Sequence, residues 1–216
     1  MRRTMSKIYL EILDKDRQKI FNSLSAFRDL GYLGGGTALA LQIKHRKSFD
    51  FDIFLPKPVN NRLRLAVSDI FGDVKFSMDT EDQLIFRTDS GVSITFLWYY
   101  FNHLNPLVET ESLKIASILD ISADKAYTIG RRSVWRDYVD IYFLLKKNFV
   151  DLRKIINLAD KKFKGAFNEA LFLEQLVYFK DLEVAPIEFL DEKPKAAEIK
   201  IFLEKQVKDY LGKNSY

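Results

Sequence analysis

The sequence predicts an α/β (α+β) protein in which an N-terminal α/β domain with a mixed sheet precedes a C-terminal helical bundle. One observation is the stretch SFDFDIF at residues 48–54, where polar and apolar side chains alternate as in a half-buried strand. A second is three short strand-like segments, at 74–78, 83–88 and 92–101, separated by turn residues. The third is the helical spacing of apolar residues from about Leu107 onward. We therefore expect one domain over residues 1–106 and another over residues 107–216.

Helices are expected wherever apolar residues recur at helical spacing between charged ones. In the first domain these segments are 6–30, 37–43 and 60–71, and Pro56 and Pro58 end the strand before the last of them. In the second domain they are 120–131, with Asp120 or Ser122 as N-cap, then 134–147, 151–163, 166–180 and 195–211. Residues 111–119 are expected to form one short element.

The composition excludes several kinds of site. The chain has no cysteine and two histidines, which excludes disulfides, thiolate zinc sites and histidine-rich metal sites, and fits the reducing cytoplasm. The longest apolar run, residues 94–101, is too short to span a bilayer, so no membrane partner is expected. A net charge of +4 and a pI near 9.0 permit a nucleic-acid partner without demonstrating one.

Two carboxylates on the predicted strand 48–54 suggest a metal site. Side chains two apart on a strand share a face, so Asp50 and Asp52 lie together with Ser48, and the other face, expected in a core, carries Phe49, Phe51 and Ile53. Neighbouring carboxylates repel each other unless a cation sits between them. Mg²⁺ accepts such oxygens and still leaves room for substrate phosphates.

A glycine-rich turn precedes this strand and suggests a phosphate site. Gly35 and Gly36 allow the backbone to approach a ligand closely, and Thr37 opens the short helix that follows. The free N–H groups and positive dipole end of a helix N-terminus favour phosphate. Phosphates at the turn and metal at the aspartates would together place a nucleoside triphosphate. Each motif is weak alone, and the order of glycines, helix, basic residues and acids carries the prediction.

A second charged cluster lies in the predicted helices at 118–147. Lys125 is on the first of them and Arg132 follows its end, while Asp137 and Asp140 share a face of the next. This pattern is typical of charge matching at helix ends together with a surface ion pair. The functional interpretation is that these cations close over the phosphates of a nucleotide.

Both clusters resemble motifs of the AbiEii/AbiGii-type nucleotidyltransferases, the toxin halves of abortive-infection toxin–antitoxin systems. The first motif resembles GGGTALALQIKHRKSFDFDIF, and the later ones resemble DISADKAYTIGRRSVWRDYVDIYFLL. The similarity covers roughly residues 30–150. It implies a DNA polymerase β-like nucleotidyltransferase domain, a helical bundle, and a nucleoside triphosphate with Mg²⁺ (or Mn²⁺) in the cleft between them.

The resemblance also implies roles for individual residues. Asp50 and Asp52 would bind metal, and Asp137 or Asp140 would act near the acceptor hydroxyl or orient Lys125. The residues implied in nucleotide binding are Gly35, Gly36, Thr37, Arg46, Ser48, Lys125 and Arg132. The chain departs from the superfamily in one respect, because Ser93 and Thr95 stand where a third acid is usual.

We expect an enzyme that transfers a nucleotidyl group from a nucleoside triphosphate to a macromolecular acceptor, with an antitoxin protein as partner. RNA, above all the end of a transfer RNA, ranks slightly ahead of a protein hydroxyl. The absent third acid motivates an alternative, a catalytically impaired nucleotide- or RNA-binding regulatory protein. A purely structural interaction module fits the charged motifs poorly. The aromatic residues at 96–101 are expected in a buried strand rather than a base-stacking surface.

Overall fold

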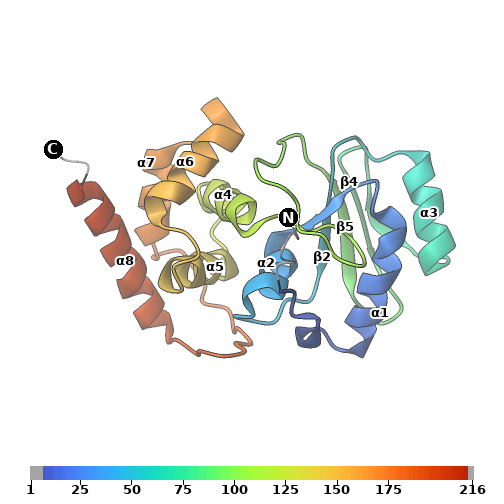
Figure 1. Ribbon diagram of the computed structural model, residues 1–216, viewed down its shortest axis with the longest axis horizontal. Helices are drawn as coiled ribbons and strands as arrows, with labels where there is room; N and C mark the ends of the chain where they lie inside the picture. The colour runs from blue at the N-terminus through green and yellow to red at the C-terminus, as the bar shows by residue number, and fades with distance from the viewer. Residues whose placement is uncertain (1–6, 214–216) are drawn as a thin grey trace, which may run out of the picture. The chain divides into compact units, whose positions relative to one another are not determined.

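The computed structural model describes residues 7–213 and divides the chain into two compact units, Met1–Ser117 and Ile118–Tyr216 (Figure 1). The division lies later than the one expected between residues 106 and 107. The reason is that the segment after residue 106 pairs within the N-terminal unit. Val108 bridges Ile115, which in turn bridges Leu33 of strand β1 (Tyr32–Gly34).

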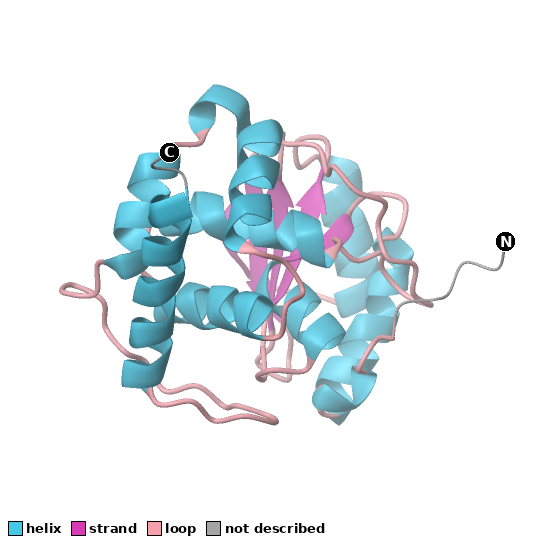
Figure 2. Ribbon diagram, turned by 60° about the vertical axis from the view of Figure 1, so that its left-hand side comes forward, coloured by secondary structure: helices cyan, strands magenta, loops and turns pink. Residues whose placement is uncertain are grey.

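The N-terminal unit is built on a five-stranded mixed sheet with strand order β1-β2-β5-β4-β3. Figure 2 shows the strands of this sheet in magenta. The strands that follow β1 are β2 (Phe51–Leu55), β3 (Phe76–Asp79), β4 (Gln83–Arg87) and β5 (Ser93–Trp98). β2 runs parallel to β5, and the other neighbouring strands are antiparallel. The mixed sheet and the antiparallel meander of β3, β4 and β5 therefore confirm the predicted fold class.

One face of this sheet forms the aromatic core of the unit. It carries Phe51, Phe86 and Phe96, all with no exposed surface. The helices on this side are α1 (Lys15–Ser23), the 3-10 turn Leu24–Phe27 and α3 (Asn61–Phe71) (Figure 1). Phe21 of α1 stacks on Phe51 at 6.3 Å, and the ring of Phe27 lies 4.9 Å from that of Phe96. The opposite face is only partly covered.

Three local expectations in this unit were wrong. The single helix expected over 6–30 is broken among the described residues into a 3-10 turn (Leu10–Ile12), α1 and a second 3-10 turn, because Asp14 caps α1. Strand β1 was not predicted, since three residues are too few to show alternation. Phe49 lies outside β2, 37% exposed, with the Arg17 guanidinium 4.9 Å from its ring, so it does not enter the core.

The C-terminal unit is helical, as expected. Its elements are α4 (Ile118–Ile129), α5 (Trp135–Lys146), α6 (Leu152–Phe163), a 3-10 turn (Lys164–Ala166), α7 (Glu169–Val177) and α8 (Ala196–Lys213). α4 begins at Ile118, so neither Asp120 nor Ser122 is its N-cap and residues 111–119 are not a separate element. None of the helices in the described part of the chain is long and apolar enough to cross a membrane.

Candidate active site

The glycine turn brings the start of a helix against a carboxylate. Helix α2 (Gly35–Ile43) follows β1 directly, and its N-cap Gly34 offers no side-chain acceptor to the first N–H groups. Gly35 has φ +65°, in the left-handed region that favours glycine. A Cβ there would lie 2.6 Å from Oδ2 of Asp52. The close approach expected of these glycines is therefore present, between the backbone of the turn and an acid of β2.

The next glycine faces a buried cation. A Cβ on Gly36 would lie 2.6 Å from Nη2 of Arg46 and 3.4 Å from the Ser48 hydroxyl oxygen. Arg46 is 2% exposed, and its Nη1 donates to the Lys47 carbonyl at 3.0 Å. A guanidinium and the positive end of a helix dipole thus lie side by side. This arrangement suits an anion such as phosphate.

Thr37 connects the first turn of α2 to the segment that carries the acids. Its hydroxyl contacts the backbone carbonyl of Asp50 and lies 2.8 Å from the Ser48 hydroxyl. A carbonyl can only accept, so Thr37 donates to Asp50 and accepts from Ser48. The two hydrogen bonds fix the backbone at Asp50 and the side chain at position 48 relative to the glycine turn.

Both predicted metal ligands are half-buried. Asp52 lies in β2, whereas Ser48 and Asp50 lie before its first residue, Phe51, so the strand face expected to carry all three is not formed. Asp52 lies opposite Gly34 on β1 and Thr95 on β5. Thr95 therefore stands beside Asp52 where a third acid would be. The described residues contain no group of three or more acids or histidines that could hold a metal. The Asp52 carboxylate beside the turn, with Asp50 two residues before it, nevertheless suits Mg²⁺, which takes its remaining oxygens from water and phosphates.

In the C-terminal unit the other predicted residues form a second cluster. Nζ of Lys125 lies 2.6 Å from Oδ1 of Asp137 and 2.6 Å from Oδ2 of Asp140, with the three side chains 8%, 2% and 0% exposed. Arg132, 60% exposed, contacts the other oxygen of Asp137 at 3.2 Å. We call these four residues the Lys125 network. The structure assembles it as a buried link between α4 and α5, with one exposed cation at its edge.

A similar cluster was missed in the sequence. Nζ of Lys162 on α6 lies 2.6 Å from Oδ1 of Asp124 and 3.5 Å from Oδ1 of Asp120, and the lysine side chain has no exposed surface. We call these residues the Lys162 network. Asp120 and Asp124 are four apart on α4, which the sequence shows, but nothing in it indicates which lysine they meet. α4 thus carries Asp124 toward α6 and the adjacent Lys125 toward α5.

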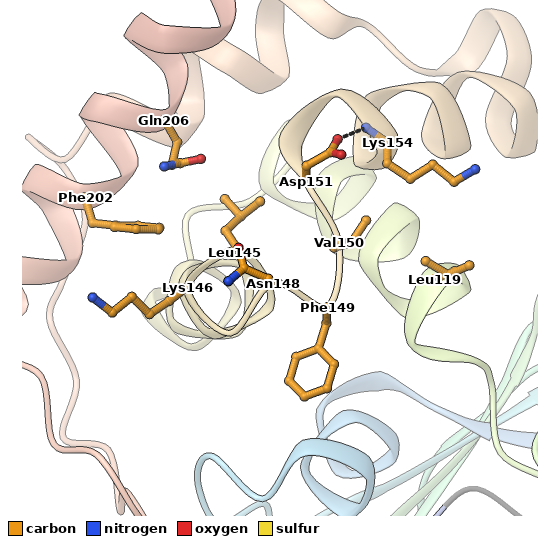
Figure 3. A pocket seen from close by; sticks show the side chains of 10 residues that line it. All are labelled: Leu119, Leu145, Lys146, Asn148, Phe149, Val150, Asp151, Lys154, Phe202 and Gln206. Atoms are coloured by element: carbon orange, nitrogen blue, oxygen red, sulfur yellow. Dashed lines mark hydrogen bonds between the residues drawn. The ribbon is translucent and has the colours of Figure 1, made fainter.

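The C-terminal unit also contains a pocket that was not expected (Figure 3). Its volume is about 540 Å³. Phe202 and Gln206 of α8 face Leu145, while the ammonium group of Lys154 points away and its backbone N–H donates to Asp151 at 2.7 Å. None of the lining residues belongs to the Lys125 network, so this pocket is separate from the predicted site residues.

Comparison with known proteins identifies the family. Residues 19–213 match the family model for the nucleotidyl transferase AbiEii toxin of type IV toxin–antitoxin systems. An uncharacterized protein of Aquifex aeolicus is 33% identical over 184 residues, which cover 83% of this chain and 87% of that protein.

Solved structures share the fold at low identity. MenT4, a nucleotidyltransferase toxin from Mycobacterium tuberculosis, superposes with a TM-score of 0.60 at 16% identity over 88% of this chain and 80% of its own. JHP933 from Helicobacter pylori superposes with a TM-score of 0.53 at 16% identity over 96% of each chain. The fold is thus that of polymerase β-like nucleotidyltransferases, and the chain belongs to the AbiEii family of nucleotidyltransferase toxins of type IV toxin–antitoxin systems.

Proposed function

We propose that this protein transfers a nucleotidyl group from a nucleoside triphosphate to an RNA acceptor, the end of a transfer RNA above all, with Mg²⁺ or Mn²⁺ as cofactor. The observation that carries the proposal is the 2.6 Å approach between the Gly35 Cβ position and Asp52. It joins a phosphate-binding turn and a metal-binding carboxylate in one small structure. Of the basic stretch 44–47, Arg46 lies beside the turn and Lys47 is exposed next to it, and an exposed cation there favours a polyanionic acceptor.

The reaction needs groups that this site contains. The acceptor hydroxyl attacks the α-phosphorus, a new P–O bond forms, the bond to the β-phosphate oxygen breaks, and pyrophosphate leaves while one of the two N-terminal carboxylates, Asp50 or Asp52, takes the hydroxyl proton. The N–H groups of Gly35, Gly36 and Thr37, together with Arg46 and Ser48, hold the phosphates. Asp50 and Asp52 would hold the metal, which would supply positive charge to offset that on the reacting phosphate.

The C-terminal unit is proposed to contribute Lys125 and Arg132 as cations for the nucleotide phosphates. The contacts of Asp137 and Asp140 favour one of the two roles expected for them. Each directs an oxygen at the Lys125 ammonium from 2.6 Å, so both orient the lysine. Both carboxylates are turned toward the lysine and are almost completely buried, so we do not assign either as the general base.

Labelled nucleoside triphosphates, Mg²⁺ and total cellular RNA test the proposal directly. We expect label on RNA with the unmodified protein and none with Asp52→Asn. RNA binding should weaken as salt rises, because phosphate contacts release counterions. Label found only on protein would reject the RNA acceptor. Triphosphate binding without any transfer would support the alternative, a catalytically impaired binding protein.

One observation favours that alternative. Thr95 lies directly beside Asp52, so the site lacks a carboxylate at this position. If metal affinity is limited because only two protein carboxylates bind the ion, Thr95→Asp should tighten Mn²⁺ binding and increase transfer, since it adds a third oxygen ligand. Thr95→Asn, similar in size and uncharged, is the control. Weaker Mn²⁺ binding by Thr95→Asp would show that two protein ligands already suffice.

Family membership also leads us to propose an antitoxin encoded with this protein. Expression of the chain alone should slow growth, and co-expression of the antitoxin should restore it. We place the reaction in the cytoplasm, where nucleoside triphosphates and RNA are both available. Normal growth of a host that lacks the antitoxin but contains the active protein would contradict this proposal.

A further inference from the structure

The sheet face that carries Asp52 continues into a group of aromatic side chains. Phe54 follows Asp52 by two residues and therefore shares its face. Its ring lies 5.7 Å from that of Tyr32 on β1 and 4.5 Å from that of Tyr99, which follows β5. At roughly 3.3 Å per residue, Phe54 is about 7 Å along the strand from Asp52. This is the scale of a single nucleotide from phosphate to base.

Tyr32 and Tyr99, the two rings that contact Phe54, line a pocket in the N-terminal unit. The pocket has a volume of about 280 Å³, and its lining includes Tyr32, Tyr99, Phe101, Asn102 and His103. The sequence favoured a buried strand over 96–101, and this was wrong beyond residue 98. β5 ends at Trp98, the side chains at 98, 99 and 101 are half-buried, and Tyr100 is 65% exposed.

The pocket presents ring surfaces and a few polar groups. Tyr32 meets His103 edge to face at 5.8 Å, and Tyr99 meets Phe101 edge to face at 5.7 Å. The two basic residues at its margin, Arg28 and Lys114, both pair with the Glu109 carboxylate. Asp29 also lines the pocket, so two carboxylates stand against the two cations. The local net charge is therefore close to zero, and the pocket suits a flat, uncharged ring with hydrogen-bonding edges better than a phosphate.

We propose that this pocket binds a nucleobase, either of the donor triphosphate or of the RNA acceptor. The identity of the ligand rests on the proposed transfer reaction, while the position of the pocket rests on the sheet face that it shares with Asp52. Stacking of a base on an aromatic side chain is typically worth about 1–3 kcal/mol. The pocket of Figure 3 also contains an aromatic ring, Phe202, with Lys146 Nζ 5.8 Å from its centroid, and it serves as the competing site.

The test measures binding of three probes to a set of folded variants. The probes are a nucleoside triphosphate, inorganic tripolyphosphate and a single-stranded RNA oligonucleotide of mixed sequence. Tyr99→Leu removes a stacking ring, Tyr99→Phe keeps it, and His103→Ala removes an exposed ring without altering the core. Matched controls are Tyr100→Leu, which does not line the pocket, and Phe202→Leu in the competing pocket.

We expect Tyr99→Leu and His103→Ala to weaken binding of the triphosphate or of the RNA about tenfold, within the range for a lost base stack. Tripolyphosphate binding should not change, because it contains no base. Weaker triphosphate binding assigns the pocket to the donor base, and weaker RNA binding assigns it to the acceptor. Thermal unfolding identifies variants that fail to fold, and His103→Ala keeps the test valid if Tyr99→Leu is among them.

Two results would overturn the inference. One is unchanged affinity of both pocket variants for the triphosphate and the RNA, and the other is a loss of RNA binding by Phe202→Leu alone. Either could occur while label transfer persists, which would leave the proposed function intact. Conversely, base-dependent binding in this pocket without any transfer by the unmodified protein would contradict the proposed function and support the pocket.

Discussion

Replacing each buried lysine of the C-terminal unit by methionine separates a structural role from a catalytic one. Lys125 and Lys162 are matched, because each is a buried lysine that contacts two aspartates of a neighbouring helix. Lys125 on α4 contacts two aspartates of α5, and Lys162 on α6 contacts two aspartates of α4, the nearer oxygen in each case at 2.6 Å. Removing one partner of a buried ion pair typically costs about 3–5 kcal/mol, since the remaining charge loses its counterion. Methionine fills most of the lysine volume, so the cost is electrostatic rather than a cavity.

The expected destabilisation is large enough to measure by thermal unfolding. Asp140, with no exposed surface, would lose the Lys125 ammonium, and Asp120, equally buried, would lose that of Lys162. For a unit of this size each kcal/mol lowers Tm by about 4–8 °C, so both variants should unfold at least about 10 °C earlier. Lys162→Met should be affected at least as strongly, because its lysine side chain is completely buried.

Transfer activity is then measured at a temperature where both variants remain folded. We expect Lys162→Met to transfer label at a rate near that of the unmodified protein and Lys125→Met to lose most of it. Lys125→Arg keeps the charge and should recover stability more than transfer, since a guanidinium does not reproduce the position of an ammonium. Equal activity of the two methionine variants would refute a catalytic role for Lys125. An unchanged Tm in both would refute the electrostatic argument itself.

Three further predictions concern the N-terminal unit. Asp50→Asn and Asp52→Asn should each abolish transfer and Mn²⁺ binding without unfolding the protein, since both acids are only half-buried and asparagine keeps their size; unfolding of either variant would contradict the metal assignment. Gly35→Ala and Gly72→Ala should each cost about 1–3 kcal/mol of backbone strain, because both glycines have a positive φ. Only Gly35→Ala should weaken triphosphate binding, because its Cβ would meet Asp52, whereas nothing lies within 4 Å of the Gly72 position. Asp14→Ala should destabilise by about 0.5–2 kcal/mol through loss of the α1 cap. The Arg17 backbone N–H lowers the pKa of Asp14 from its usual value, so the charge-dependent part of this stabilisation is present above the unfolded-state pKa and is lost as pH falls through the lowered pKa; a Tm difference that does not shrink as the pH is lowered would refute it.

The mixed sheet could be predicted because its longer strands alternate and its turns carry recognisable residues. β2 shows the pattern directly, with Phe51 and Ile53 buried on either side of the half-buried Asp52. β1 shows no such pattern, because three residues are held in place by their partners on β2 rather than by their own preference. The alternating pattern wrongly predicted that Phe49 belongs to the buried face of the strand, because the strand begins only at Phe51.

The two clusters differ in how far local sequence determines them. The turn, its cation and both acids lie within a short stretch, and Thr37 ties the turn to Asp50 through a hydrogen bond inside that stretch. Residues so close in the sequence must also lie close in space, so this cluster can be predicted from the sequence alone. The Lys162 network joins α4 to a helix more than thirty residues later, and its ion pairs depend on how α4 and α6 pack. A lysine near the end of an amphipathic helix is usually a solvated charge, so only the packing shows that Lys162 is buried between two aspartates. The same reasoning applies to the aromatic pocket, whose rings come from β1 and from the segment after β5 and meet only because β2 pairs with both strands.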